Sequence, residues 1–273
     1  GGGPPNIIWG GTEAQIEKSD IPCVEGNSRG YVAITEPSGG SDPRNNIQTR
    51  AVRRDEKWIL NGTKMWITGA LGADYGVIFA RTDDGDDDSP PEITAFIVEP
   101  SFPGISFEAI AVIRALSPYE ISLRDCEVPG ENVLGQVGGG FSVAQTWLVD
   151  ARIPYAAGCI GIAQEALDMA CGWVKQRVTQ REVLAEKQAI QWMIADSEVE
   201  LRAARLLVYQ AATHADMGHN TKVDASICKL FGTETAFRVV DRAIQMFGGM
   251  GVAKEMPLER WLRELRVKRI GEG

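Results

Sequence analysis

The sequence predicts an α+β chain in which an antiparallel β-barrel or sandwich is followed by a four-helix bundle. Two observations support this fold class. Short β-branched and aromatic runs separated by turn residues recur between residues 31 and 129. Beyond Phe141, long segments carry apolar residues at the 3.6-residue period of a helix. The run Gly138-Gly139-Gly140 lies where the pattern changes, so we expect a domain boundary there.

The first 30 residues fit neither half. Residues 11–18 have the pattern of a helix end, but nothing upstream in the sequence could cover it. We therefore expect residues 1–30 to be a remnant of an N-terminal helical domain that is largely missing. Residues 31–137 are then the middle β domain and residues 138–273 the helical domain.

The sequence predicts eight strands followed by four helices. The expected strands are residues 31–35, 47–53, 58–60, 65–68, 76–81, 93–99, 105–110 and 120–123. Asn61-Gly62 stands between the third and fourth of these strands, and because Asn-Gly favours a type I′ turn, we predict a hairpin there. The expected helices are residues 142–178, 184–217, 223–247 and 257–269.

Composition argues against several classes of function. The net charge is −9 and there is no basic run, so a nucleic-acid surface is not expected. Five scattered cysteines and two histidines give no metal-ligand spacing, so we do not expect a metal site. No uninterrupted apolar run reaches about 18 residues, so we do not expect a membrane span. The acidic run at residues 83–88 predicts a solvated connection; a calcium loop is the alternative, but the closing glutamate of an EF-hand is absent.

Three places carry candidate binding groups. The loop at residues 35–42 offers hydroxyls and backbone amides that could bind a heteroaromatic edge or a diphosphate, although a plain turn explains it equally. Trp66 and Thr68 are two residues apart on one strand face and could contact a flat cofactor, unless Trp66 packs in the core. Glu272, between two glycines, could be aimed at a substrate; a frayed tail is the alternative. No GxGxxG follows a strand, so a Rossmann site is not supported.

Six motifs follow one another along the chain: Thr35-Glu36-Pro37 with Gly40-Ser41-Asp42, Asn61 to Thr68, Val128-Pro129 with Asn132 to Gly135, Gly138 to Phe141, Gln245 to Gly249, and Ile270 to Gly273. Their order is that seen in the acyl-CoA dehydrogenase family, and from about Gly11 to its last residue the chain resembles members of that family. The resemblance implies a subunit with an N-terminal helical domain, a middle β-barrel and a C-terminal four-helix bundle, of which this chain resembles the second and third. It further implies FAD, a homotetramer, and oxidation of an acyl-CoA to the trans-2-enoyl-CoA.

The resemblance also implies roles for individual residues. Those implied to contact FAD are Thr35, Ser41, Trp66, Thr68, Arg177, Thr179, Gln188, Gln245, Gly248 and Gly249. Of these, Arg177, Thr179, Gln245, Gly248 and Gly249 would reach the cofactor of a neighbouring subunit. Ser41 and Arg152 would also line the acyl-CoA channel, although Arg152 could instead form a surface salt bridge.

Glu272 occupies the position of the family's catalytic base. Burial disfavours the charge of a carboxylate and so makes it more basic, which suits removal of the weakly acidic proton α to a thioester. Some members place the base on the helix near Arg152, but the preceding residue here is Ala151, which favours Glu272. Gln180 and Arg181 depart from the family pattern, and Gly271, where many members carry an aromatic residue, could widen the acyl pocket.

Partners and alternatives follow from the same resemblance. Electrons would pass to an electron-transfer flavoprotein or a similar acceptor, in the cytoplasm of a bacterium or the mitochondrial matrix of a eukaryote. The alternatives are a related acyl-CoA oxidase or monooxygenase, or a truncated, non-catalytic oligomerisation module.

Overall fold

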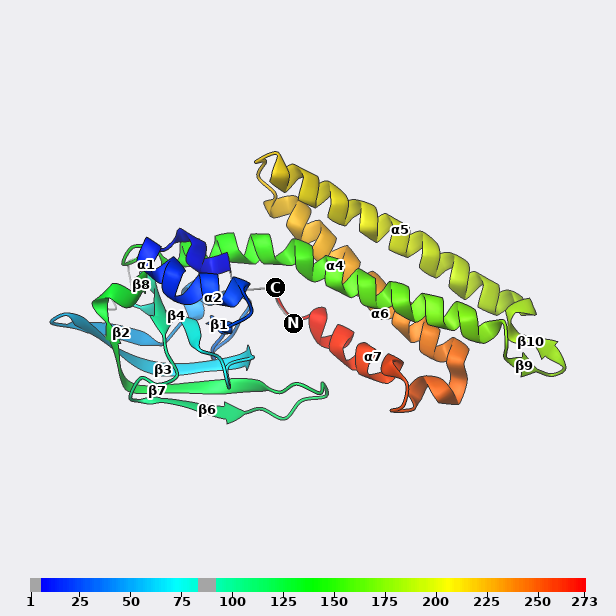
Figure 1. Cartoon of the computed structure of the whole chain (residues 1–273), viewed down its shortest axis with the longest axis horizontal. Helices are drawn as coiled ribbons and strands as arrows, with labels where there is room; N and C mark the ends of the chain where they lie inside the picture. Colours follow the sequence, from blue (N-terminus) through cyan, green and yellow to red (C-terminus); the bar gives the residue numbers. More distant parts are fainter. Residues whose placement is uncertain (1–5, 83–91) are drawn as a thin grey trace. The chain divides into compact units, whose positions relative to one another are not determined.

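The computed structural model describes residues 6–82 and 92–273, so the acidic run at residues 83–88 lies outside the described residues. The chain divides into two compact units (Figure 1). The first consists of the residues up to Val112, residues 116–147 and Gly273; the second consists of residues 113–115 and 148–272.

The first unit is built on one eight-stranded sheet. Its strands are β1 (Gly30–Ala33), β2 (Arg50–Arg54), β3 (Lys57–Thr68), β4 (Tyr75–Arg81), β5 (Ile93–Val98), β6 (Ile105–Ala109), β7 (Pro118–Pro129) and β8 (Val133–Leu134). They are ordered β6-β7-β3-β2-β4-β5-β8, with β1 also paired to β4. The pairs β1–β4 and β2–β4 are parallel and the others are antiparallel. The α+β prediction is confirmed, but the sheet is mixed, because long connections let β1 and β2 run in the direction of β4.

Strand β4 is buried on both faces. Tyr75, Val77 and Phe79 belong to one hydrophobic cluster, which also holds residues of β5 and β8. Ile78 and Ala80 belong to a second cluster, built largely from β3, β5 and β7. Successive side chains of a strand point to opposite faces, so this central strand reads as an unbroken apolar run.

Short helical turns precede the sheet: η1 (Asn6–Gly10), α1 (Glu13–Gln15), η2 (Ile16–Asp20) and α2 (Ile21–Val24). They pack on the sheet's own core, since Ile7 and Ile8 are buried with Phe79 and Leu134. The Gln15 side chain donates hydrogen bonds to the carbonyls of Glu131 (2.8 Å) and Val133 (2.9 Å). The assignment of residues 1–30 to a separate domain stays a prediction, as do the other two domain boundaries.

The predicted hairpin at Asn61-Gly62 is wrong. β3 continues through both residues with a bulge, and its turn to β2 lies earlier, at Asp55, which has a φ of 53°. The Asn61 side chain pairs with Asp125 of β7, and Gly62 has a φ of 153°. A Cβ at residue 62 would lie 2.6 Å from the Thr49 Cα, so Asn-Gly serves a bulge and a close backbone approach here.

The second unit is helical, as predicted. Its elements are α4 (Gly140–Val174), whose first residues to Trp147 belong to the first unit, β9 (Val178–Thr179), β10 (Glu182–Val183), η4 (Leu184–Glu186), α5 (Gln188–Asp216), α6 (Lys222–Phe247), η5 (Gly248–Val252) and α7 (Pro257–Lys268). Four helices share one core, to which Leu167, Leu201, Val240 and Leu265 each contribute. The first helix ends earlier than expected, because residues 178–183 form a hairpin with Gln180 (φ 53°) and Arg181 (φ 67°) at its turn.

Among the described residues, no helix combines the length and apolar character needed to cross a bilayer. The same part of the chain holds no group of three or more His, Cys, Asp or Glu side chains placed to bind a metal ion.

Candidate functional site

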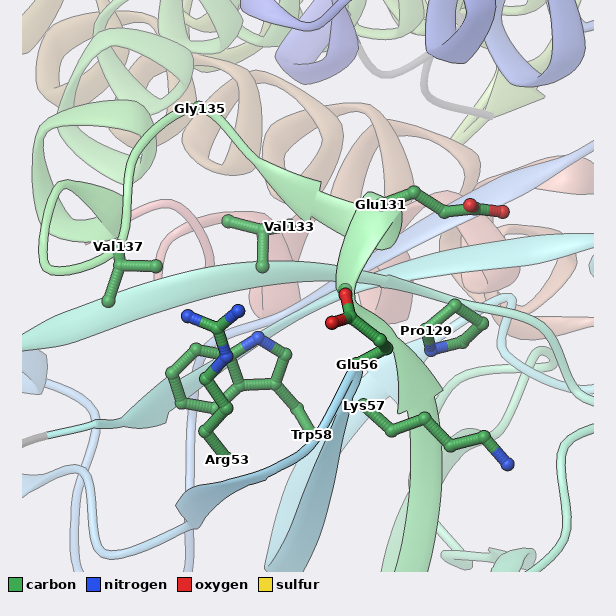
Figure 2. A pocket seen from close by; sticks show the side chains of 10 residues that line it. Arg53, Glu56, Lys57, Trp58, Pro129, Glu131, Val133, Gly135 and Val137 are labelled. Atoms are coloured by element: carbon green, nitrogen blue, oxygen red, sulfur yellow. The ribbon is translucent and has the colours of Figure 1, made fainter.

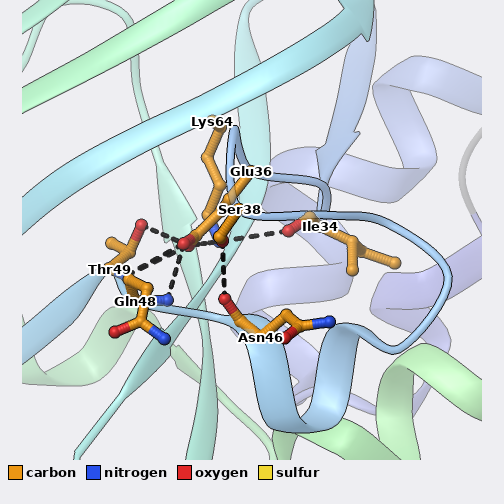
Figure 3. A network of polar contacts seen from close by, with 7 residues as sticks. All are labelled: Ile34, Glu36, Ser38, Asn46, Gln48, Thr49 and Lys64. Carbon is orange, nitrogen blue, oxygen red and sulfur yellow. Dashed lines mark hydrogen bonds and ion pairs between the residues drawn. The ribbon is translucent and has the colours of Figure 1, made fainter.

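The loop at residues 34–49 is fastened to β3 by a buried ion pair. The Lys64 Nζ lies 2.7 Å from the Glu36 Oε1, with side chains 0% and 3% exposed, and it also donates to the Ile34 carbonyl at 3.2 Å. Glu36 further accepts hydrogen bonds from the Gln48 amide at 2.6 Å and from the Thr49 amide and hydroxyl at 3.1 and 2.5 Å (Figure 3). The ion pair therefore joins both ends of the loop to one point on β3.

Both charges of this pair are perturbed. Burial lowers the pKa of Lys64 to about 8, although Glu36 opposes the shift. Burial acts to raise the pKa of Glu36, but Lys64 and the donors around the carboxylate outweigh it and hold that pKa below its ordinary value. Sequence analysis missed this pair because the two residues are 28 positions apart and each could equally be a surface charge.

Trp66 is presented to solvent by a bulge beside this ion pair. The register of β3 against β7 shifts between Lys64 and Ile67, and the Met65 amide donates to the Thr35 carbonyl at 2.8 Å. Trp66 has a φ of 65°, which is uncommon for a bulky residue, and its side chain is 52% exposed. The alternative of a core tryptophan is therefore wrong.

The structure brings Thr35 and Trp66 to the same place. Thr68 is exposed two residues beyond Trp66, and Ser41 is exposed farther along the Thr35 loop. An exposed indole on the strand that binds the Thr35 loop suits stacking on a flat heteroaromatic ring, and hydroxyl groups suit its polar atoms, so these residue types fit a flavin.

In the second unit, Glu272 is held in a constrained turn. Its φ is 64° and its Oε2 is buried, with no hydrogen-bond partner in the part of the chain that the structure describes. Burial raises the pKa of the carboxyl group; Lys268, Arg152 and Lys229 act in the opposite direction without cancelling the effect. A frayed tail does not describe this side chain.

Arg152 fixes the backbone of that turn. Its Nε donates to the Glu272 carbonyl at 2.9 Å, and its Nη1 donates to the Ser226 hydroxyl at 3.1 Å. The terminal turn is thus held against α4 and α6. Lys229 of α6, which is only 5% exposed, adds a bond to the Arg269 carbonyl at 3.2 Å.

Tyr155, which sequence analysis missed, fills the space beside Gly271. It follows Arg152 by three residues and therefore lies on the same face of α4. A Cβ at residue 271 would lie 2.7 Å from the Tyr155 hydroxyl, and the Lys268 Nζ stands 4.1 Å from the centroid of the Tyr155 ring. Gly271 could have widened the acyl pocket, but the Tyr155 hydroxyl takes up the space that a side chain at residue 271 would need.

This packing predicts a specific pair of stability effects. Gly271→Ala should lower the free energy of unfolding by about 1–3 kcal/mol through overpacking. The additional substitution Tyr155→Phe should restore most of that loss, because the nearest remaining ring atom, Cζ, is 3.8 Å from the new Cβ. Urea unfolding of both variants measures the difference. Gly161→Ala is the control, since in the described part of the chain its added Cβ would meet no heavy atom within 4 Å beyond its chain neighbours and its own helix backbone; an equal loss there would contradict the steric explanation.

A second group of predicted residues gathers where α4 and α6 end and α5 begins. Trp173 of α4 stacks on Phe247 of α6 with ring centroids 5.0 Å apart, and the Arg177 guanidinium lies 6.0 Å from the Trp173 ring. The other members of the group are Thr179 on β9, Gln188 at the start of α5, and Gln245, Gly248 and Gly249 around the end of α6.

These residues are not close to Glu272 within one chain. Arg152, which binds the Glu272 backbone, and Trp173 are 21 positions apart on α4, which corresponds to roughly 30 Å of helix. The predicted site residues of the second unit thus form two separate groups.

A surface cavity of about 530 Å³ in the first unit contains none of the predicted residues. Arg53, Lys57, Trp58 and Glu131 are among its lining residues (Figure 2). Its lining residues on β3 are Lys57 and Trp58, whereas Trp66 is eight residues beyond Trp58, a span of about 26 Å at most for an extended strand. This cavity is therefore distinct from the Thr35–Trp66 surface.

Comparisons with known proteins agree across both units. Residues 32–126 match the acyl-CoA dehydrogenase middle domain, and residues 138–273 match the acyl-CoA dehydrogenase C-terminal domain. A short-chain-specific acyl-CoA dehydrogenase of Megasphaera elsdenii is 40% identical, over 98% of this chain and 70% of that protein. A subunit of the caffeyl-CoA reductase–Etf complex of Acetobacterium woodii is 39% identical, over 100% of this chain and 71% of that protein. The solved structure of butyryl-CoA dehydrogenase from Megasphaera elsdenii superposes with a TM-score of 0.92 at 38% identity, covering 98% of this chain and 71% of that one.

Proposed function

This chain belongs to the acyl-CoA dehydrogenase family, an FAD-dependent class of enzymes that oxidise acyl-CoA thioesters, and from that premise we propose that Glu272 is the catalytic base. The observation that carries this proposal is the buried Oε2 of Glu272, which has no hydrogen-bond partner among the described residues and belongs to a carboxyl group whose pKa is raised by burial. A carboxylate in such an environment is more basic than one in water, and it has a free acceptor atom for a substrate proton.

The surrounding residues keep this base in place. Arg152 holds the Glu272 carbonyl, so we propose that it acts as a positioning residue as well as a neighbour of the acyl-CoA. Lys268, Arg152 and Lys229 each favour the charged form of the carboxyl group, because each opposes the effect of burial on its pKa. Burial thus makes the Glu272 carboxylate more basic, while the three cations favour its charged form, which is the form that accepts a proton.

Thr35, Ser41, Trp66 and Thr68 are proposed to hold the flavin ring, because Trp66, Thr68 and Ser41 are exposed and the half-buried Thr35 is joined to β3 at Met65, next to Trp66. When bound, FAD would accept the β-hydrogen of the substrate as hydride, leaving the trans-2-enoyl-CoA. Exposed Trp66 supplies a plane for stacking, and Thr35 and Thr68 supply hydroxyl groups for polar ring atoms.

The second group, around Arg177, Thr179, Gln188, Gln245, Gly248 and Gly249, is proposed to bind the FAD of a neighbouring subunit. This group lies roughly 30 Å along α4 from the turn that holds Glu272. That distance supports the proposal that the group binds the cofactor of a different subunit. A homo-oligomer, which we propose to be a tetramer, would supply the missing half of each cofactor site.

We also propose a short acyl group and an electron-transfer flavoprotein as the electron acceptor. Tyr155 beside Gly271 supports a compact acyl site. The relatives named for short-chain substrates and for an Etf complex support the same choice. The compartment stays as predicted from the resemblance: cytoplasm in a bacterium, mitochondrial matrix in a eukaryote.

Anaerobic flavin reduction tests this function. The purified protein, saturated with FAD, is mixed with butyryl-CoA in the absence of oxygen, and the flavin absorbance should bleach. Reoxidation should require an electron-transfer flavoprotein. Rapid reoxidation by air with formation of peroxide would favour the oxidase alternative, and a protein that binds no FAD would favour the oligomerisation module.

The pH profile of bleaching gives an independent prediction. The reactive form of Glu272 is the carboxylate, and burial raises its pKa, so the rate should increase as pH rises through that raised pKa and then level off. Lys268→Met removes the neighbouring cation with the largest opposing effect, so the profile should move to higher pH. Stopped-flow rates across the pH range measure both curves; a shift to lower pH would contradict the assignment.

A further inference from the structure

We propose that Glu36 and Lys64 are positioning residues that set how Thr35 and Trp66 are presented to FAD, an inference that rests on the proposed function. Lys64 binds the loop at the Ile34 carbonyl, and Glu36 binds it again at the amides of Gln48 and Thr49. One ion pair therefore closes the base of the loop that carries Thr35 and Ser41 (Figure 3).

The same pair borders the strained part of β3. Lys64 is fully buried and Ile67 is 4% exposed, whereas Trp66 between them is 52% exposed with a left-handed backbone. A non-glycine residue remains in this conformation only where its surroundings impose it. Here the surroundings are the Lys64–Glu36 pair, the Met65–Thr35 backbone bond and the burial of Ile67.

Core stability alone would not require charges at this point. Well-packed apolar residues commonly replace a buried ion pair without loss of stability. Apolar side chains, however, would not bind the Ile34 carbonyl and the amides of residues 48 and 49, so they would leave the loop free to move away from Trp66. A pair that only stabilised the core could be replaced by two apolar residues without effect on FAD binding. A pair that positions the loop could not, because the double apolar variant would fold but bind FAD more weakly.

The experiment uses the FAD-loaded full chain with Lys64→Met, Glu36→Gln and the double variant Glu36→Met/Lys64→Met. The dissociation constant of FAD and the visible circular dichroism of the bound flavin are measured for each. We expect the double variant to recover thermal stability relative to Lys64→Met but to bind FAD about tenfold more weakly than wild type, equivalent to the loss of about one hydrogen bond. Its flavin circular dichroism at saturating FAD should also differ from wild type.

Lys57→Met is the matched control, because Lys57 lies on the same strand and its ion pair with Glu127 is exposed. It should bind FAD as wild type does. Thr49→Val is a second variant, for use if the double variant does not fold. It leaves both charges in place and removes one hydrogen-bond donor to Glu36. Like the double variant, it should bind FAD more weakly than wild type.

Wild-type FAD affinity and flavin circular dichroism in the double variant, or in Thr49→Val if the double variant is unfolded, would overturn the proposal. Failure of the wild-type chain to bind FAD would instead overturn the proposed function, so the two failures are distinguishable.

Discussion

Replacing Glu272 with Gln is expected to leave FAD bound and to slow anaerobic flavin bleaching by acyl-CoA by about 10²–10⁴-fold. The amide keeps the shape of the side chain but cannot accept a proton. The backbone contacts of residue 272 come from its carbonyl, which binds Arg152, so the substitution leaves them in place. Stopped-flow absorbance at the flavin band measures the rate, and flavin release on denaturation measures FAD content.

Two controls separate loss of the base from general damage. Glu272→Asp keeps a carboxylate but shortens the side chain by one bond, so it should retain more activity than the glutamine variant. Glu255→Gln changes an exposed glutamate of the same unit and should bleach at the wild-type rate. Bleaching of Glu272→Gln at the wild-type rate would remove Glu272 from the mechanism.

Replacing Lys64 with Met should lower the free energy of unfolding by about 3–5 kcal/mol, the usual cost of leaving one member of a buried ion pair alone. Glu36 would then be a buried charge without its cation, although it would keep the donors of Gln48 and Thr49. Denaturant unfolding followed by circular dichroism measures the loss.

Lys57→Met is the control for the stability loss expected of Lys64→Met. The Lys57–Glu127 pair is as short, at 2.6 Å, but its side chains are 57% and 50% exposed. Exposed pairs contribute about 0–1 kcal/mol, so this variant should be nearly as stable as wild type. Equal losses at both lysines would show that burial does not decide the cost.

Most of the fold could be predicted from periodicity. The largely apolar runs of β4 and β5 and the helical period of α5 and α6 are local properties of the sequence, and the structure confirms these elements. Asn61-Gly62 was misassigned because the same dipeptide suits a two-residue turn and a bulge. The choice between them depends on Thr49, which approaches Gly62 from a distant part of the chain.

In the candidate site, too, local motifs could be predicted from the sequence, whereas contacts between distant residues could not. Glu272 and Trp66 stand in recognisable motifs, so their positions could be predicted, although the burial of one and the exposure of the other could not. Lys64, Glu36 and Tyr155 gain their importance from contacts between residues far apart in sequence, such as the Tyr155 hydroxyl beside Gly271. Periodicity and spacing hold no information about such contacts.

A crystal structure of the FAD-loaded protein with a bound, non-oxidisable acyl-CoA analogue would show whether Glu272 reaches the substrate. We expect a carboxylate oxygen of Glu272 to lie about 3–3.5 Å from the α-carbon of the bound thioester, within reach for proton removal. A thioester bound with its α-carbon beyond the reach of Glu272, and beside another proton acceptor, would contradict it.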